Sequence, residues 1–268
     1  MRLIDTHCHL YDEPLAADLT GVLHRARAAG VEALVVVGTT LRTSRQAVAL
    51  ASAHPDVWAA VGLHPDADEP LDLDALTGLL ANDRVVAVGE IGLDGSQGKE
   101  RLAAQEPACR AQLALARDHG LPALVHSRDA TGRMVRILED LGPGGPGGIL
   151  HAYAGSREVA LALVDLGFHL GVAGVVCRPR ATRIRRVLGS LPLSALVLET
   201  DAPFIGTATR PKGQVEPAQV REVCQALAAL HDLDPEAVAA ATTATARRLL
   251  SLPPVGPPPA RLSPVPVA

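Results

Sequence analysis

Two histidines stand two residues apart near the start of the chain, within the segment Asp5-Thr6-His7-Cys8-His9. They follow a short apolar run, which is typical of a buried β-strand. Because residues i and i+2 of a strand point to the same side, His7 and His9 can bind one metal ion together. Polar residues are common where a strand leaves the core, so the pair needs support from further ligands.

Further residues of metal-binding types follow other apolar runs. Each is a histidine or a carboxylate at the end of an expected strand, and the full set is His7, His9, Glu90, His126, His151 and Asp201. A single histidine after a strand is usually a solvated or hydrogen-bonded loop residue. Six such residues on one rim of a parallel barrel predict a shared metal site, because active sites of this architecture form at that rim.

Mixed imidazole and carboxylate ligands suit Zn, Mn, Ni, Co or Fe, and Mg is a further candidate. Six ligands exceed what one catalytic ion takes when it keeps room for water, and Glu90 can bridge two ions. We therefore expect two divalent metal ions per chain. Such ions lower the pKa of bound water to about 7, so the site predicts hydrolysis.

The elements that must position these residues alternate along the chain. Apolar runs of β type are separated by stretches of helical periodicity, such as 15–29, 104–119 and 157–166. The expected strands begin near Leu3, Ala33, Val57, Val85, Pro122, Gly148, Phe168 and Leu196. Eight βα repeats in about 250 residues predict the α/β class and a TIM-type (β/α)8 barrel.

Length and composition suit one large domain. The chain has 268 residues, of which 48% are hydrophobic, enough for a full core over residues 1–250. Residues 251–268 are rich in proline, and we expect them to form an extended tail without chemistry. No apolar stretch is long enough to span a bilayer, and the first residues lack the pattern of a signal peptide. We therefore expect no membrane association and a cytoplasmic location.

Charge and cysteine spacing exclude several classes of partner. The formal net charge of −4 gives no general attraction to nucleic acid, so DNA or another phosphodiester must be bound locally. The four cysteines are scattered and lack Cys-x-x-Cys spacing, which indicates reduced thiols rather than a zinc knuckle. No feature of the sequence indicates an obligate protein partner.

Five segments of the chain carry a resemblance to a known family. They are Asp5-Thr6-His7-Cys8-His9, Gly62-Leu63-His64-Pro65, Gly89-Glu90-Ile91-Gly92-Leu93-Asp94, His126-Ser127-Arg128 and Glu199-Thr200-Asp201-Ala202-Pro203. This series resembles the motifs of TatD-type metal-dependent hydrolases, in the same order and over about residues 1–250. Within the family, the segment from Gly171 to Leu193 is most similar to the YjjV-like branch.

The resemblance implies a distorted TIM barrel with a two-metal centre. His7, His9, Glu90 and Asp201 would hold one ion, and Glu90, His126 and His151 would hold the other. Asp201 would also take a proton from the attacking water, which makes Asp201 and Glu90 the expected catalytic residues. His64 and Arg128 would face the substrate phosphate. Characterised relatives act as 3′-to-5′ exonucleases on DNA or RNA, so the resemblance implies phosphodiester hydrolysis, with single-stranded DNA as the expected substrate.

Arginines after the seventh expected strand support local phosphate binding. Arg178 and Arg180 stand where barrels often bind phosphate, and their guanidinium groups match phosphate oxygens, so we expect one of them to contact substrate. The chain departs from the family at His151-Ala152-Tyr153-Ala154-Gly155, where relatives often have His-Cys-Phe-Ser-Gly. It also has only five aromatic residues, which leaves little material for stacking bases.

Other functions remain open alternatives. Many barrel amidohydrolases bridge their metals with a carboxylated lysine after strand four, and Glu90 at that position argues against this subgroup. A phosphomonoesterase of the polymerase-and-histidinol-phosphatase type also begins with His-x-His and is the nearest enzymatic alternative, beside other metallohydrolases of small substrates. The complete ligand set argues against a metal-binding module without catalysis.

Overall fold

Eight parallel strands form one sheet in which each strand pairs with the next along the chain. The computed structural model describes residues 1–96, 98–142, 145 and 147–253. The strands are β1 (Leu3–Cys8), β2 (Val31–Val37), β3 (Val57–Val61), β4 (Val85–Asp94), β5 (Ala123–Arg128), β6 (Gly148–Leu150), β7 (Phe168–Val172) and β8 (Leu196–Leu198). The predicted α/β barrel is confirmed, and every expected strand start lies within two residues of the observed one.

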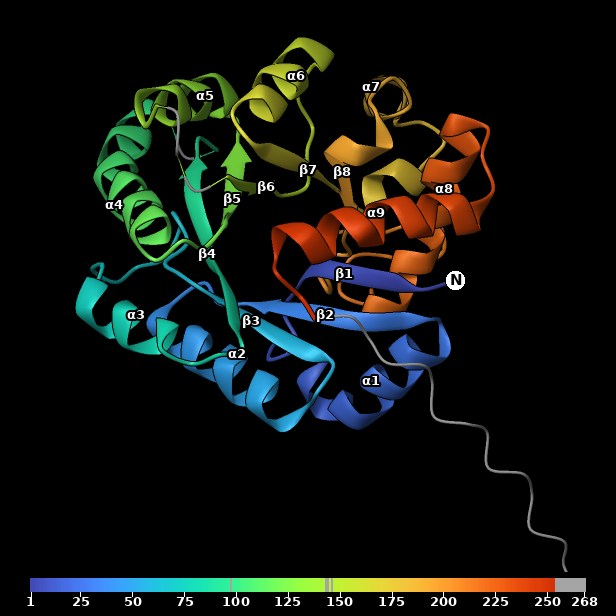
Figure 1. Cartoon of the computed structure of the whole chain (residues 1–268), viewed down its shortest axis with the longest axis horizontal. Coiled ribbons are helices and arrows are strands. Elements are labelled where there is room, and N and C mark those ends of the chain that lie inside the picture. Colours follow the sequence, from blue (N-terminus) through green and yellow to red (C-terminus); the bar gives the residue numbers. More distant parts are fainter. Residues whose placement is uncertain (97, 143–144, 146, 254–268) are drawn as a thin grey trace, which may run out of the picture.

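Helices connect the strands and surround them, as Figure 1 shows. They are α1 (Leu19–Ala28), α2 (Leu41–Ala53), α3 (Leu73–Leu80), α4 (Lys99–Asp118), α5 (Thr131–Asp140), α6 (Arg157–Asp165), α7 (Thr182–Leu188), α8 (Val220–His231) and α9 (Pro235–Leu249). The predicted helix 104–119 begins earlier, at Lys99, because its polar first turn carries no apolar periodicity. No helix in the described part of the chain is long and apolar enough to cross a membrane.

The strands are buried on both faces, which explains their nearly continuous apolar sequences. In β2, Leu34 and Val36 pack with the surrounding helices, whereas Val35 and Val37 belong to a separate cluster inside the barrel. Small residues such as Ala87 share this interior cluster. The alternation leaves the last residues of the strands to form the rim where the candidate ligands stand.

The interior cluster is completed by the end of the chain. Figure 1 shows α9 beside β1 and β8, and Ala246 and Leu250 pack into the interior cluster. Leu252 is also buried there, so the core extends two residues past the expected boundary at residue 250. The rest of the expected proline-rich tail, residues 254–268, lies outside the described residues.

The barrel is closed between β8 and β1 without a regular ladder. One isolated bridge joins Cys8 to Ala202, where the His9 amide donates to the Ala202 carbonyl over 2.8 Å. Nearby, the backbone N–H and the hydroxyl of Thr200 donate to the Asp5 carboxylate over 2.9 and 2.6 Å. These bonds hold the ends of β1 and β8 together, so the barrel is distorted at this seam as the family resemblance implies.

Candidate metal centre

The six expected metal ligands converge at the carboxyl ends of the strands. His7 lies at the end of β1, Glu90 in β4 and His126 in β5, while the other three directly follow a strand or lie within three residues of one: His9, His151 and Asp201. All are buried except His126, which is partly exposed. Residues that are far apart in the sequence thus form one cluster at a single rim.

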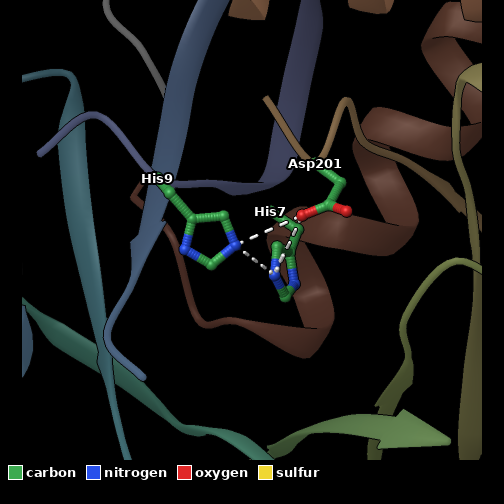
Figure 2. Close-up of side chains that lie close together, drawn as sticks. All are labelled: His7, His9 and Asp201. Carbon is green, nitrogen blue, oxygen red and sulfur yellow. Dashed lines mark hydrogen bonds and ion pairs between the residues drawn. The ribbon is translucent and has the colours of Figure 1, made fainter. Parts of the chain in front are cut away.

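His7, His9 and Asp201 form the first group of possible ligands. Figure 2 shows the two rings and the carboxylate turned toward one another. The His9 Nε2 atom lies 3.2 Å from Asp201 Oδ1 and 3.2 Å from His7 Nε2. One atom from each residue lies within 4.8 Å of the others, which is the spacing that a shared cation needs.

Glu90 lies between two further groups. Its Oε2 atom is 3.3 Å from His7 Nε2, and His151 completes this group. Its Oε1 atom is 3.0 Å from His126 Nδ1 and 3.6 Å from His64 Nε2. The two oxygens therefore face different sets of imidazoles, which is the arrangement of a carboxylate that can bridge two ions.

The grouping differs in detail from the one that the resemblance implies. His151 lies with His7 and Glu90, and its ring stacks on the His7 ring with centroids 3.8 Å apart. His64, expected at the substrate phosphate, lies close enough to Glu90 and His126 to be a ligand itself. The sequence carried no signal for these positions of His151 and His64, because they depend on the orientation of the imidazole rings.

In three of the histidines, one ring nitrogen faces a carboxylate or a backbone carbonyl outside the predicted ligand set. His126 Nε2 is 3.0 Å from Asp94 Oδ2, and His9 Nδ1 is 3.1 Å from the Val37 carbonyl. His151 Nδ1 lies 2.9 Å from Glu199 Oε1, although the two atoms are not aligned for a hydrogen bond. Such partners orient metal-binding imidazoles and leave the other nitrogen for the ion.

Asp94 and Glu199 were not among the residues predicted for the site. Both belong to the motif segments, Asp94 four residues after Glu90 and Glu199 two residues before Asp201. Glu199 is fully buried, and its Oε2 atom has no hydrogen-bond partner among the described residues. An acidic residue directly after an apolar strand is the signal that could have identified it.

Two glycines allow the close packing that this arrangement needs. Gly171 lies against Glu199, and a Cβ atom at Gly171 would stand 2.4 Å from Glu199 Oε2. Gly92 has φ of +140°, and a Cβ there would stand 2.0 Å from the His126 carbonyl oxygen. A side chain at Gly92 would clash with the backbone, and one at Gly171 would displace the Glu199 carboxylate, so both glycines allow these groups to lie at the site.

The electrostatics of the cluster favour ionised carboxylates. Burial alone would raise the pKa of Glu90, but the charge of His7 and hydrogen bonds from His126 and His7 hold it well below its usual value. Burial opposes ionisation of Asp201 as well, yet the neighbouring His151 and His9 lower its pKa. Buried anions need cationic partners, and imidazoles release protons when a metal binds. The donor set therefore fits divalent ions.

The protonation of His151 also depends on neighbouring carboxylates. Burial disfavours its charged form, but Glu199 and Asp201 outweigh burial and raise the pKa of His151 to about 10. Burial and the charge of His151 together lower the pKa of the adjacent His7. One ring of this stacked pair is therefore protonated before the other.

A cavity of about 520 Å³ opens above the cluster. Beside the candidate ligands, its lining includes Arg128, Phe204 and Lys212. Arg128 and His64 were predicted to face substrate, and the structure brings both to this cavity. Phe204 was not predicted there, whereas Lys212 follows the eighth expected strand, in the region where barrels often bind phosphate.

Arg178 and Arg180 are not brought to this cavity. The Arg178 guanidinium donates to the Gly206 carbonyl over 2.7 and 3.2 Å, so it holds the loop after β8. Arg180 is exposed and is not part of the lining. The sequence placed both arginines after the right strand, but side-chain direction was not readable from the sequence.

Comparison with known proteins agrees with this fold. Residues 4–251 match the family described as TatD related DNase, and the chain belongs to this family of metal-dependent hydrolases. The chain is 37% identical to the uncharacterised metal-dependent hydrolase YabD of Bacillus subtilis, over 93% of this chain and 99% of YabD. It is 35% identical to the 3′-5′ ssDNA/RNA exonuclease TatD of Salmonella typhimurium, with the same coverage.

A solved structure is similar over nearly the whole chain. The crystal structure of the TatD homologue YjjV of Escherichia coli superposes with a TM-score of 0.88 at 34% identity. The match covers 94% of this chain and 99% of YjjV. The predicted family and barrel are therefore confirmed, and the protein is a metal-dependent hydrolase.

Proposed function

We propose that the protein is a two-metal phosphodiesterase that removes nucleotides from the 3′ end of single-stranded DNA. The proposal depends on the position of Glu90. Its two carboxylate oxygens face two different groups of imidazoles beneath one open cavity. The similarity to exonucleases supports the choice of substrate.

Six side chains would hold the two ions. His7, His9 and Asp201 would bind one, Glu90 would bridge, and the other would be bound by His126 with His151 or His64. When bound, divalent ions polarise phosphoryl oxygens and make water acidic enough to attack near neutral pH. The metal could be Mg, Mn, Zn, Ni, Co or Fe, because these ligand types suit several of them.

The protein's own residues would supply orientation and proton transfer. Asp201 is ionised at neutral pH and borders the cavity, so it accepts the proton of the attacking water. The new bond forms between that water oxygen and phosphorus, the bond from phosphorus to the 3′ oxygen breaks, and the 3′ oxygen takes a proton from solvent to become the new 3′ hydroxyl. Arg128 donates to the non-bridging phosphate oxygens, where its guanidinium offsets the charge that develops.

A labelled oligonucleotide tests this function. Single-stranded DNA with a 5′ label is incubated with the protein and Mg²⁺ or Mn²⁺, beside an Asp201→Asn variant prepared in the same way. We expect a ladder that shortens from the 3′ end with the unchanged protein and no ladder with the variant. If metal-loaded protein leaves the DNA intact but hydrolyses phosphate monoesters, the phosphomonoesterase alternative replaces this proposal.

We also propose a cytoplasmic location. All four cysteines are buried and free, without a disulfide between them, which is typical of proteins in a reducing compartment. Fractionation of cells that produce the protein tests this, with recovery from the periplasm or medium as the contrary result.

A further inference from the structure

A second cavity of about 520 Å³ lies next to the one above the metal centre. The two cavities share His126, Arg128, His151, Asp201, Phe204 and Lys212 in their linings. The second cavity extends toward α7 and the loops after β5 and β6, where Tyr153 and Arg183 line it. A molecule that occupies both cavities therefore passes over the candidate ligands.

The second cavity carries an excess of positive charge. Arg128, Arg183 and Lys212 line it, and the acidic residues in its lining are Asp129 and the candidate ligand Asp201. Across the described part of the chain, neither the Arg128 nor the Lys212 side chain has a hydrogen-bond or ion-pair partner. Cations without internal partners on a concave surface are free to bind an anion.

Arg183 is held in place at the rim of this cavity. Its guanidinium donates to the Ala154 carbonyl over 2.7 Å and reaches the Gly155 carbonyl over 3.4 Å. These contacts link α7 to the loop after β6 and fix the direction of the side chain. The remaining N–H groups of the Arg183 guanidinium can donate to a bound anion without a large loss of side-chain entropy.

Phe204 lies in the lining of both cavities. Its side chain is 41% exposed, which makes it one of the few large apolar residues on the described surface. Its ring meets the His9 ring edge to face, with centroids 5.2 Å apart. An exposed aromatic ring beside cationic groups is the combination that single-strand binding surfaces use to stack a base and hold its phosphate.

We propose that the second cavity binds the nucleotide next to the cleaved bond, with its phosphate on Arg183 and Lys212 and its base against Phe204. This inference rests on the proposed function and deepens it. A monoester or a small diester has one phosphate, which would sit at the metal centre and leave these cations without a role. The substrate is therefore an oligonucleotide with at least one phosphate beyond the one attacked.

Short substrates of defined length test the proposal. The dinucleotide d(TpT) offers only the cleaved phosphate, whereas d(TpTpT) adds one neighbour. For the unchanged protein we expect kcat/KM for the trinucleotide to exceed that for the dinucleotide by about tenfold, because one charged contact contributes roughly 1.4 kcal/mol. In Lys212→Met this ratio falls toward one. Arg186→Met is the control, because Arg186 is an exposed arginine of α7 that does not line the cavity. In this variant the ratio should stay as in the unchanged protein.

A binding measurement without catalysis gives an independent readout. The affinity of a fluorescent trinucleotide is followed by anisotropy in EDTA over a range of salt concentrations. Lys212→Met should reduce the slope of log K against log salt by about 0.7, the value for one phosphate contact on a single strand.

The outcomes separate this inference from the proposed function. Cleavage of both substrates with equal kcat/KM, or an unchanged ratio in Lys212→Met, would overturn the second subsite while leaving a phosphodiesterase. Cleavage of neither substrate by metal-loaded protein would overturn the proposed function, and the subsite with it. Because the Lys212 side chain makes no hydrogen bond or ion pair with the described residues, its replacement tests binding rather than folding.

Discussion

Glu90 links two of the groups of possible ligands in the candidate site. Its oxygens face His7 on one side and His126 with His64 on the other, and the side chain is buried. We expect Glu90→Ala to lower metal content to one ion or fewer per chain and to abolish hydrolysis. Elemental analysis measures the metal, and circular dichroism checks that the fold is intact. Glu139→Ala, on the exposed face of α5, is the control, and equal turnover in both variants would refute the bridging role.

Glu199 acts on the site through His151. Its Oε1 atom is 2.9 Å from His151 Nδ1 and accepts the Ala152 backbone N–H over 2.6 Å, so one carboxylate positions both the ring and the following turn. We expect Glu199→Gln to weaken metal binding by about 10- to 100-fold, which is usual when such a partner is lost. Titration calorimetry measures the affinity. Asp129→Asn, an exposed nearby acid, should bind metal as the unchanged protein does.

At the scale of elements, the closeness of β4 and β5 depends on Gly92. Its positive φ and its contact with the His126 carbonyl leave no room for a side chain. We expect Gly92→Ala to lower the free energy of unfolding by about 2 kcal/mol or more, through strain at this position. Gly78 in α3 is the matched control, because open space surrounds it. Alanine at this position should raise the free energy of unfolding by about 0.5–1 kcal/mol. Urea denaturation distinguishes the two, and equal stability of both variants would contradict the packing argument.

A surface ion pair ties α1 to the start of β3. Arg27 donates two bonds of 2.7 Å to Asp56, and although burial opposes it, this pairing lowers the pKa of Asp56. The carboxylate therefore contributes stability above its ordinary pKa of 3.8, and this contribution is lost as pH falls through the lower folded value. We expect Asp56→Asn to lower the free energy of unfolding by about 0.5 kcal/mol at pH 7, and by progressively less as pH falls below 3.8. Thermal unfolding over this pH range measures the difference, and a penalty that persists at low pH would exclude the pairing as its cause.

At the scale of the whole molecule, the barrel interior is closed by the end of the chain. Leu250 is fully buried in the interior cluster, immediately after α9. We expect Leu250→Ala to lower the free energy of unfolding by about 2–4 kcal/mol, since the lost side chain leaves a cavity. Leu233→Ala, at a residue that is 46% exposed, should change it by less than about 0.5 kcal/mol. Calorimetry compares the melting temperatures, and similar values would show that the segment after α9 is not part of the core.

The same segment bears on the extent of the domain. The sequence predicts a domain of residues 1–250 followed by a tail, yet Leu252 packs beside Leu250 in the interior. Proline content marked the region as unable to build a core of its own, but it could not show that one leucine within it completes the core of the barrel. We propose that the domain includes residues up to Pro253.

The amino-acid sequence alone determined the fold class, the family and the types of ligand at the site. This was possible because alternation of apolar runs is a local pattern, and because parallel strands bring their ends to one rim whatever the details of packing. The residue types and their places after apolar runs were therefore enough to group His7, His9, Glu90, His126, His151 and Asp201.

Only the tertiary structure decided which of these residues face one another. The pairing of Asp94 with His126 and of Glu199 with His151, the approach of His64 to Glu90, and the rotation of Arg178 onto the Gly206 carbonyl all depend on side-chain directions. The seam between β1 and β8 joins residues at opposite ends of the domain. Such contacts have no local sequence period, because they arise where segments distant in the chain are packed together.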